Sequence, residues 1–193
     1  MNVESPAKCI SIYREVFSEE SANHFIKNLE HETTSDWSEL SWGSSKIGDG
    51  VSSKYRTSLT CSLIPLMKPY PETELSKYFT ENIRTPIEKV TNDYRTEYLI
   101  PSGMHAAYQL LKYYPESEYH AHVDHAPDNR RVFSMVSCIL APEDGGDLAF
   151  PFFDLSITME TGMVILFPAN FPYLHIAHAV NSGIKYSLVT WYE

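Results

Sequence analysis

The second half of the sequence, from about residue 104 to residue 193, is a series of short apolar segments separated by residues that favour turns. The separators at 126–129, 142–147 and 181–183 are rich in Pro, Asp, Asn and Gly. Short segments punctuated in this way are typical of β-strands. Many short strands at close spacing predict a closed or two-sheeted β structure such as a jelly roll. The predicted strands are 105–114, 119–123, 131–140, 148–150, 155–159, 163–167 and 185–192.

The first half shows helical periodicity in two places. Ser18 is a good helix N-cap, and the acidic and apolar residues that follow it predict a helix to about Glu30. Residues 71–98 carry apolar side chains at three- or four-residue spacing, which predicts a second helical region that Pro86 divides or kinks. We also predict a short strand over 9–13 and a loop with one short strand over 31–53.

Helices that precede strands imply that the helices pack on the outside of one sheet. We therefore predict an α+β fold, in which a double-stranded β-helix (jelly-roll) core carries N-terminal supporting helices on one of its sheets. The length suits a single domain over 1–193. Residues 1–103 would supply mainly helical support and lid loops, and residues 104–193 the β core that holds a metal site.

The composition argues against several kinds of partner. With 15 basic and 25 acidic residues the net charge is −10. This disfavours nucleic acid or an anionic membrane, because phosphate contacts need clusters of Lys and Arg. No run approaches the length of a membrane span, no secretory signal is visible, and the three cysteines form no disulfide or zinc pattern. We expect a cytoplasmic protein with reduced thiols.

A His-x-Asp tripeptide, His122 to Asp124, falls on one of the predicted strands. Because side chains alternate along a strand, both ligand-type side chains would lie on the same face. Another histidine, His175, follows downstream, and Lys185 comes ten positions after it. Two histidines and one carboxylate are the ligand set of the non-heme Fe(II) oxygenases. A cation just beyond the distal histidine offers a partner for a dicarboxylate cosubstrate.

Several further blocks share one family's order and spacing. Tyr113 lies nine residues before His122, and residues 144–151 read Asp-Gly-Gly-Asp-Leu-Ala-Phe-Pro. Residues 175–186 read His-(x)3-Ala-Val-x-x-Gly-x-Lys-Tyr, and Trp191 follows six positions after the lysine. Over residues 104–193 the sequence resembles the Fe(II)/2-oxoglutarate dioxygenases, within them the prolyl 4-hydroxylase-like branch. It departs from the family pattern, away from the ligand positions, at Glu116, Leu148 and Ala179.

The resemblance implies roles for five residues. His122, Asp124 and His175 would be the metal ligands and catalytic centre, and Lys185 with Tyr113 would bind the far carboxylate of 2-oxoglutarate. Fe(II), 2-oxoglutarate and O2 would be the cofactors, with ascorbate supportive. An unactivated C–H would be hydroxylated with release of succinate and CO2. The first-choice substrate is a prolyl residue in a peptide or protein, and the second is a free amino acid or small molecule.

Other histidines leave alternatives open. His120 and His122 would suit a non-enzymatic, cupin-like metal-binding barrel, an arrangement that leaves Asp124 without a role. His178 competes with His175 as the distal ligand, although the motif spacing favours His175. We expect no nucleic-acid or membrane partner, and the oligomeric state stays open.

Two loops, 41–54 and 126–131, are candidates for a lid over the site. The residues in them that we expect to contact substrate are Trp42, Arg130 and Arg131.

Overall fold

The computed structural model describes residues 6–36, 38–47, 51–52, 54–67, 72–101, 103, 105–127 and 130–193. Its largest element is a seven-stranded antiparallel sheet with the strand order β1-β12-β8-β15-β6-β5-β2. The strands, in that order, are Ser11–Tyr13, Met163–Pro168, Phe133–Leu140, Lys185–Tyr192, Gln109–Tyr113, Leu59–Ser62 and Gly43–Ser44.

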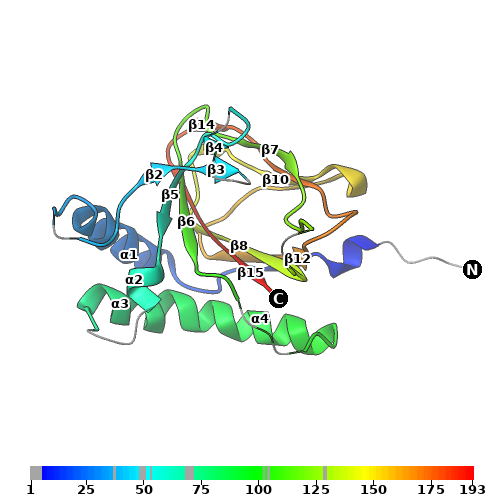
Figure 1. Ribbon diagram of the computed structural model, residues 1–193, viewed down its shortest axis with the longest axis horizontal. Helices are drawn as coiled ribbons and strands as arrows, with labels where there is room; N and C mark the ends of the chain where they lie inside the picture. Colours follow the sequence, from blue (N-terminus) through cyan, green and yellow to red (C-terminus); the bar gives the residue numbers. More distant parts are fainter. Residues whose placement is uncertain are drawn as a thin grey trace, which may run out of the picture.

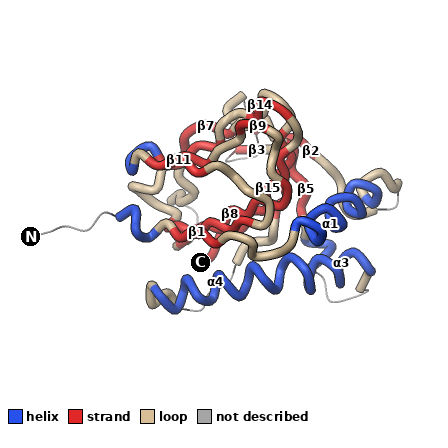
Figure 2. The backbone as a smooth tube through the Cα atoms, turned by 180° about the vertical axis from the view of Figure 1, so that it is seen from behind, coloured by secondary structure: helices blue, strands red, loops and turns tan. Residues whose placement is uncertain are grey.

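A second, four-stranded sheet faces the first, with the order β11-β10-β13-β7. Figure 1 shows β7 and β10 above β8 and β12, and Figure 2 shows the same two layers from behind. Its strands are Leu155–Ile157, Leu148–Phe150, His175–Ala177 and Tyr119–His122. Buried side chains from both sheets meet between them: Cys138, Ile165 and Phe167 from the large sheet, and Leu148, Phe150 and Ile157 from the small one.

Two small strand pairs complete the β structure. β14 (Val180–Ser182) pairs with β9 (Asp144–Gly145), and β3 (Lys46–Ile47) pairs with β4 (Val51–Ser52). Gly145 and Gly146 both have positive φ, and a Cβ at Gly145 would lie 2.7 Å from the main-chain oxygen of Ala179. Glycine is therefore required where β9 approaches β14.

The helices cover the other face of the large sheet, below it in Figure 1. They are α1 (Glu19–Glu32), the short α2 (Ile64–Met67), α3 (Glu74–Phe79), a π-helical turn (Thr80–Arg84) and α4 (Thr85–Glu97). Short 3₁₀ turns span Pro6–Cys9 and Pro151–Phe153. One apolar core joins the helices to the sheet, and it includes Phe25, Phe79, Ile87, Leu110, Met135 and Leu188.

The helical predictions agree closely with the structure. The Ser18 side chain accepts a hydrogen bond from the main-chain N–H of Ser21, as an N-cap does. Pro86 lies in the first turn of α4, where a missing N–H is tolerated, and the π-helical turn precedes it. None of the helices in the described part of the chain has the length and apolar character that a membrane crossing requires.

The first half also contributes strands, so its description as mainly helical was incomplete. β1, β2 and β5 belong to the large sheet, and residues 31–53 contain three short strands where one was predicted. Strands of two residues are too short to show an alternating pattern. Trp37, Met104 and parts of the two predicted lid loops (48–50, 53 and 128–129) lie outside the described residues.

Candidate metal centre

The structure brings His122, Asp124 and His175 together at one end of the small sheet. His122 ends β7 and pairs directly with His175 at the start of β13, while Asp124 follows β7 by two residues. The Nε2 atoms of His122 and His175 each lie 3.6 Å from an Asp124 carboxylate oxygen. The three ligand atoms lie within 4.8 Å of one another. Among the described residues this is the one group of His, Cys, Asp or Glu side chains arranged to hold a metal ion.

Each histidine of this group has one ring nitrogen occupied by the backbone. His122 Nδ1 lies 2.8 Å from the main-chain oxygen of His120, and His175 Nδ1 lies 3.1 Å from that of Tyr173. Only an N–H can bond a carbonyl, so these contacts place the proton on Nδ1 and leave the lone pair on Nε2. In both rings Nε2 is the nitrogen that faces Asp124. This tautomer directs the free lone pair into the site, as metal binding requires.

Burial and neighbouring groups shift the pKa values of His175 and Asp124 in directions that favour binding of a cation. Burial lowers the pKa of His175 to about 4, so the ring is neutral at physiological pH. Burial alone would raise the pKa of Asp124, but His122 and His175, when protonated, and the hydrogen bond that Ser134 Oγ donates hold it below its usual range. The cluster therefore offers two imidazole nitrogens and one carboxylate, a donor set that fits Fe(II).

A pocket between the two sheets connects this cluster with the predicted cosubstrate residues. Its walls include His122, Asp124, His175, Lys185 and Tyr113. The remaining lining is largely apolar: Leu111, Met135, Val136, Leu148, Met159, Ala177, Val189 and Trp191. All five residues predicted from the sequence thus surround a single cavity, with few polar groups competing for what binds there.

Lys185 is a buried cation in this pocket. Only 2% of the residue is exposed, and burial lowers the pKa of its amine to about 8. Its Nζ donates a hydrogen bond of 2.7 Å to the main-chain oxygen of Gly146 and lies 4.4 Å from the centre of the Tyr113 ring. Within the described part of the chain no carboxylate forms an ion pair with it. A buried amine of this kind is stabilised by an anion.

Arg56 is a pocket residue that the sequence did not indicate. It forms a β-bridge with Tyr119, and its guanidinium lies 4.8 Å from the centre of the Tyr119 ring, which stacks on His122. Its Nη1 donates to the main-chain oxygen of Lys46 at 3.1 Å, whereas its Nε is buried and has no hydrogen-bond partner among the described residues. Nothing near Arg56 in the sequence resembles a motif, because the pairing with β7 is long-range.

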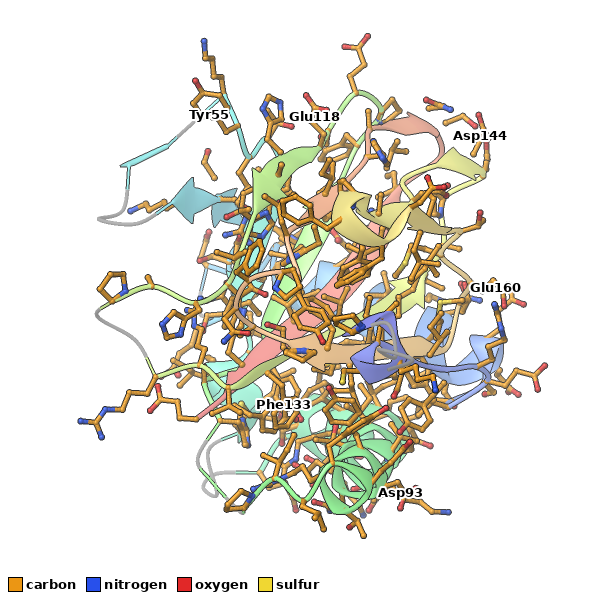
Figure 3. The ribbon with its side chains drawn as sticks, turned by 90° about the vertical axis from the view of Figure 1, so that its right-hand side faces the viewer. Tyr55, Asp93, Glu118, Phe133, Asp144 and Glu160 are labelled. Carbon is orange, nitrogen blue, oxygen red and sulfur yellow. The ribbon has the colours of Figure 1, made fainter. Side chains whose placement is uncertain are left out.

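The competing histidines lie away from the cluster. His120 Nε2 bonds Glu118 at 2.9 Å and its ring packs edge-on to Tyr55. Figure 3 shows Tyr55 and Glu118 at the outer edge of the molecule. His178 is exposed on the segment between β13 and β14. Neither side chain belongs to the described His-Asp-His group, so the geometry favours the His122–Asp124–His175 set over the alternatives.

The expectation for Trp42 was wrong. Its ring packs against Tyr186 and lies 5.4 Å from Lys112 Nζ, in the core beneath the helices rather than in the pocket. Arg131 does lie beside the site: its Nη1 donates to the main-chain oxygen of Asp124 at 3.0 Å and its guanidinium lies 3.9 Å from the centre of the Trp191 ring. Arg130 is exposed next to it.

Comparison with known proteins places this pocket in a family. Residues 108–193 match the family model of the 2OG-Fe(II) oxygenase superfamily, a segment that contains all five predicted site residues. Residues 108–193 of this chain correspond to a 2OG-Fe(II) oxygenase domain. The dioxygenase class and its cofactors, Fe(II), 2-oxoglutarate and O2, are thereby confirmed. No curated protein matches the sequence significantly.

Solved structures share the fold of this oxygenase at low sequence identity. A viral collagen prolyl hydroxylase from Paramecium bursaria Chlorella virus-1, in complex with 2OG, has 19% identity and a TM-score of 0.69, covering 95% of this chain and 94% of its own. A Pseudomonas putida prolyl-4-hydroxylase has 15% identity, a TM-score of 0.71 and coverages of 95% and 92%. A Trichoplax adhaerens prolyl hydroxylase, in complex with a hypoxia inducible factor peptide, has 13% identity and a TM-score of 0.72, covering 95% of this chain and 82% of its own.

Proposed function

We propose that this oxygenase hydroxylates an unactivated C–H of a prolyl residue in a peptide or protein, releasing succinate and CO2. His122, Asp124 and His175 are the iron ligands, and Lys185 with Tyr113 anchors 2-oxoglutarate. One observation carries the proposal: the cluster of two histidines and one carboxylate lines the same largely apolar pocket as a buried lysine that has no carboxylate partner among the described residues.

We propose further that the two facing sheets form a double-stranded β-helix and that residues 1–193 make up one domain. The apolar core between the sheets and the continuous core beneath the helices support this assignment. The scaffold keeps the ligand-bearing strands rigid, because β7 and β13 pair at His122 and His175 themselves.

The protein's part in the reaction is to position the metal ligands and to exclude water. Iron, 2-oxoglutarate and O2 would supply the oxidising chemistry when bound. The backbone carbonyls of His120 and Tyr173 orient the two ligand rings, and Phe150 and Phe167 pack against His175 at ring-centre distances of 5.9 and 4.8 Å. The apolar lining keeps solvent from the reacting centre.

The Lys185 amine suits the far carboxylate of a dicarboxylate. It lies on β15 directly opposite Tyr113 on β6, so both side chains approach the cavity from neighbouring strands. A Lys provides a point charge with three donors, and one of these is held by Gly146. The Tyr113 phenol, whose pKa burial raises, stays protonated and can donate a further hydrogen bond to the same carboxylate.

The substrate class is inferred from the structural relatives and from the arginines near the site. The solved structures with this fold are named as prolyl hydroxylases, and one holds a peptide, which supports a prolyl substrate. Arg56 and Arg131 supply donors near the metal ligands for a peptide backbone or an acidic side chain. A free amino acid or small molecule is the second candidate, since a small polar substrate could use the same two arginines.

A peptide panel tests the proposed function. Purified protein is incubated with Fe(II), ascorbate and 2-oxoglutarate in the presence of proline-containing peptides, matched peptides with Ala in place of Pro, and free amino acids. We expect succinate formation to rise with proline peptides and these peptides to gain the mass of one oxygen atom on the prolyl residue. Oxygen gained only by free amino acids would support the second candidate. A protein that forms no succinate under any condition would contradict both.

A further inference from the structure

Ser134 holds one oxygen of the proposed carboxylate ligand. It lies on β8 of the large sheet, and its Oγ donates a hydrogen bond of 2.6 Å to Asp124 Oδ2. Ser134 is 1% exposed and Asp124 is 8% exposed, so the bond is shielded from water. A hydroxyl that donates to a buried carboxylate forms a charge-assisted hydrogen bond, which is shorter and stronger than a neutral one.

The main chain of Asp124 is already held on both sides. Its N–H donates to the main-chain oxygen of Ala169 at 3.0 Å, and its carbonyl accepts from Arg131 Nη1 at 3.0 Å. The freedom that remains to Asp124 is rotation of its side chain. Among the described residues, the hydrogen bond from Ser134 Oγ to Oδ2 restricts this rotation.

A second serine on the same strand shows what an ordinary buried hydroxyl does here. Ser137, three residues along β8, is fully buried and donates to the main-chain oxygen of Met163 at 3.0 Å. That bond satisfies the serine within the large sheet and touches no residue of the metal cluster. Ser134 and Ser137 therefore differ in their acceptor while sharing residue type, strand and burial.

We propose that Ser134 is a positioning residue that makes Asp124 a one-oxygen ligand. Its hydroxyl donates to Oδ2, which also lies 3.6 Å from His175 Nε2, and leaves Oδ1, 3.6 Å from His122 Nε2, as the oxygen that is free of this hydrogen bond and is presented to the metal. A carboxylate bound through both oxygens would take up a position that the cosubstrate or O2 needs. This inference rests on the proposed role of Asp124 as a metal ligand.

Titration with Co(II) as a spectroscopic probe tests the inference without turnover. The intensity and position of Co(II) visible absorption bands respond to the number and geometry of its ligands. Four proteins are compared: the wild type, Ser134→Ala, the matched control Ser137→Ala, and Asp124→Ala, with circular dichroism to establish folding. Ser134→Gly, which also lacks the hydroxyl and adds no group that could bind Co(II), provides a second test if Ser134→Ala does not fold.

The expected result is that Ser134→Ala binds Co(II) about 10- to 100-fold more weakly and with an altered visible spectrum, as loss of a partner of a metal ligand typically does. Ser134→Gly should shift in the same direction, and Ser137→Ala should match the wild type in affinity and spectrum. Wild-type affinity and spectrum in both Ser134 variants would overturn the positioning role alone. Co(II) binding that survives Asp124→Ala unchanged would instead overturn the proposed metal site.

Discussion

The amine of Lys185 lies 4.4 Å from the centre of the Tyr113 ring, and the two residues are direct partners in the pairing of β15 with β6. Both are almost completely buried, at 2% exposure each. This arrangement places a cation and a phenol next to each other in a pocket that His122, Asp124 and His175 also line. A ligand with one metal-chelating group and a second carboxylate matches this combination of groups.

Replacing Lys185 by Ala should weaken 2-oxoglutarate binding and leave metal binding intact. The variant removes the cation opposite the far carboxylate, and a lost charged hydrogen bond of about 1.5–3 kcal/mol corresponds to roughly 10- to 150-fold in affinity. Equilibrium binding of 2-oxoglutarate to the metal-loaded protein measures the effect.

The matched control for this variant is Lys112→Ala. Lys112 is also buried and is the neighbour of Tyr113 on β6, but its Nζ bonds Glu30 at 3.0 Å beneath helix α1. Loss of that contact should lower thermal stability without changing cosubstrate affinity. Equal cosubstrate affinity in Lys185→Ala and the wild type would show that the anchor is assigned to the wrong residue.

The same lysine predicts a pH dependence. Burial lowers its pKa to about 8, so the free protein carries the cation below that pH and loses it above. Affinity for 2-oxoglutarate should therefore be constant below about pH 8 and fall by up to about tenfold per pH unit above it. Binding measured from pH 6.5 to 9.5 checks this. Lys185→Arg keeps its charge over that range, and a wild-type decline that persists unchanged in this variant would refute the explanation.

Burial of Lys185 also affects stability, with the opposite sign. An unfolded lysine holds its proton up to a pKa near 10.5, whereas the folded one releases it near 8. Between these values the unfolded state binds more protons, so the free energy of unfolding should rise with pH over this window. Urea unfolding of the protein without 2-oxoglutarate at pH 8 and pH 10 should show this rise in the wild type relative to Lys185→Met.

How far the site could be predicted depended on the range of the interactions involved. The strand that carries Lys185 was predicted with its exact bounds, 185–192, because a long apolar run between turns is a local signal. β13 was missed, since its three residues, His175–Ala177, are too few to show a period. The histidine was identified by its spacing to Lys185, and its direct pairing with His122 emerged only from the fold.

Two other residues show where reading the sequence failed. Arg56 reaches the pocket because it bridges to Tyr119, a contact between distant segments that no local pattern records. Trp42 was expected at the pocket because it lies in a polar loop, but its ring packs with Tyr186 on the face of the large sheet that the helices cover. The large, mainly apolar side chain of Trp42 packs against the nearby core instead of lining the site.

Arg56→Gln should impair use of the peptide substrate more than it impairs binding of iron or 2-oxoglutarate. The guanidinium lies at Tyr119 with a buried, unpartnered Nε among the described residues, so a substrate acceptor would satisfy it. We expect KM for a peptide substrate to rise about tenfold or more, with Kd for 2-oxoglutarate within about twofold of the wild type. Arg84→Gln, in the helical layer, is the control. An unchanged KM would exclude Arg56 from substrate recognition.

The most direct test of the central claim is succinate formation from 2-oxoglutarate, measured with and without Fe(II) in the wild type, His175→Ala and His178→Ala. The two histidines are three residues apart, but only His175 belongs to the buried metal cluster. We predict Fe(II)-dependent succinate in the wild type and in His178→Ala, and a loss of at least about 100-fold in His175→Ala. Full succinate formation by His175→Ala, or none by the wild type, would contradict this claim.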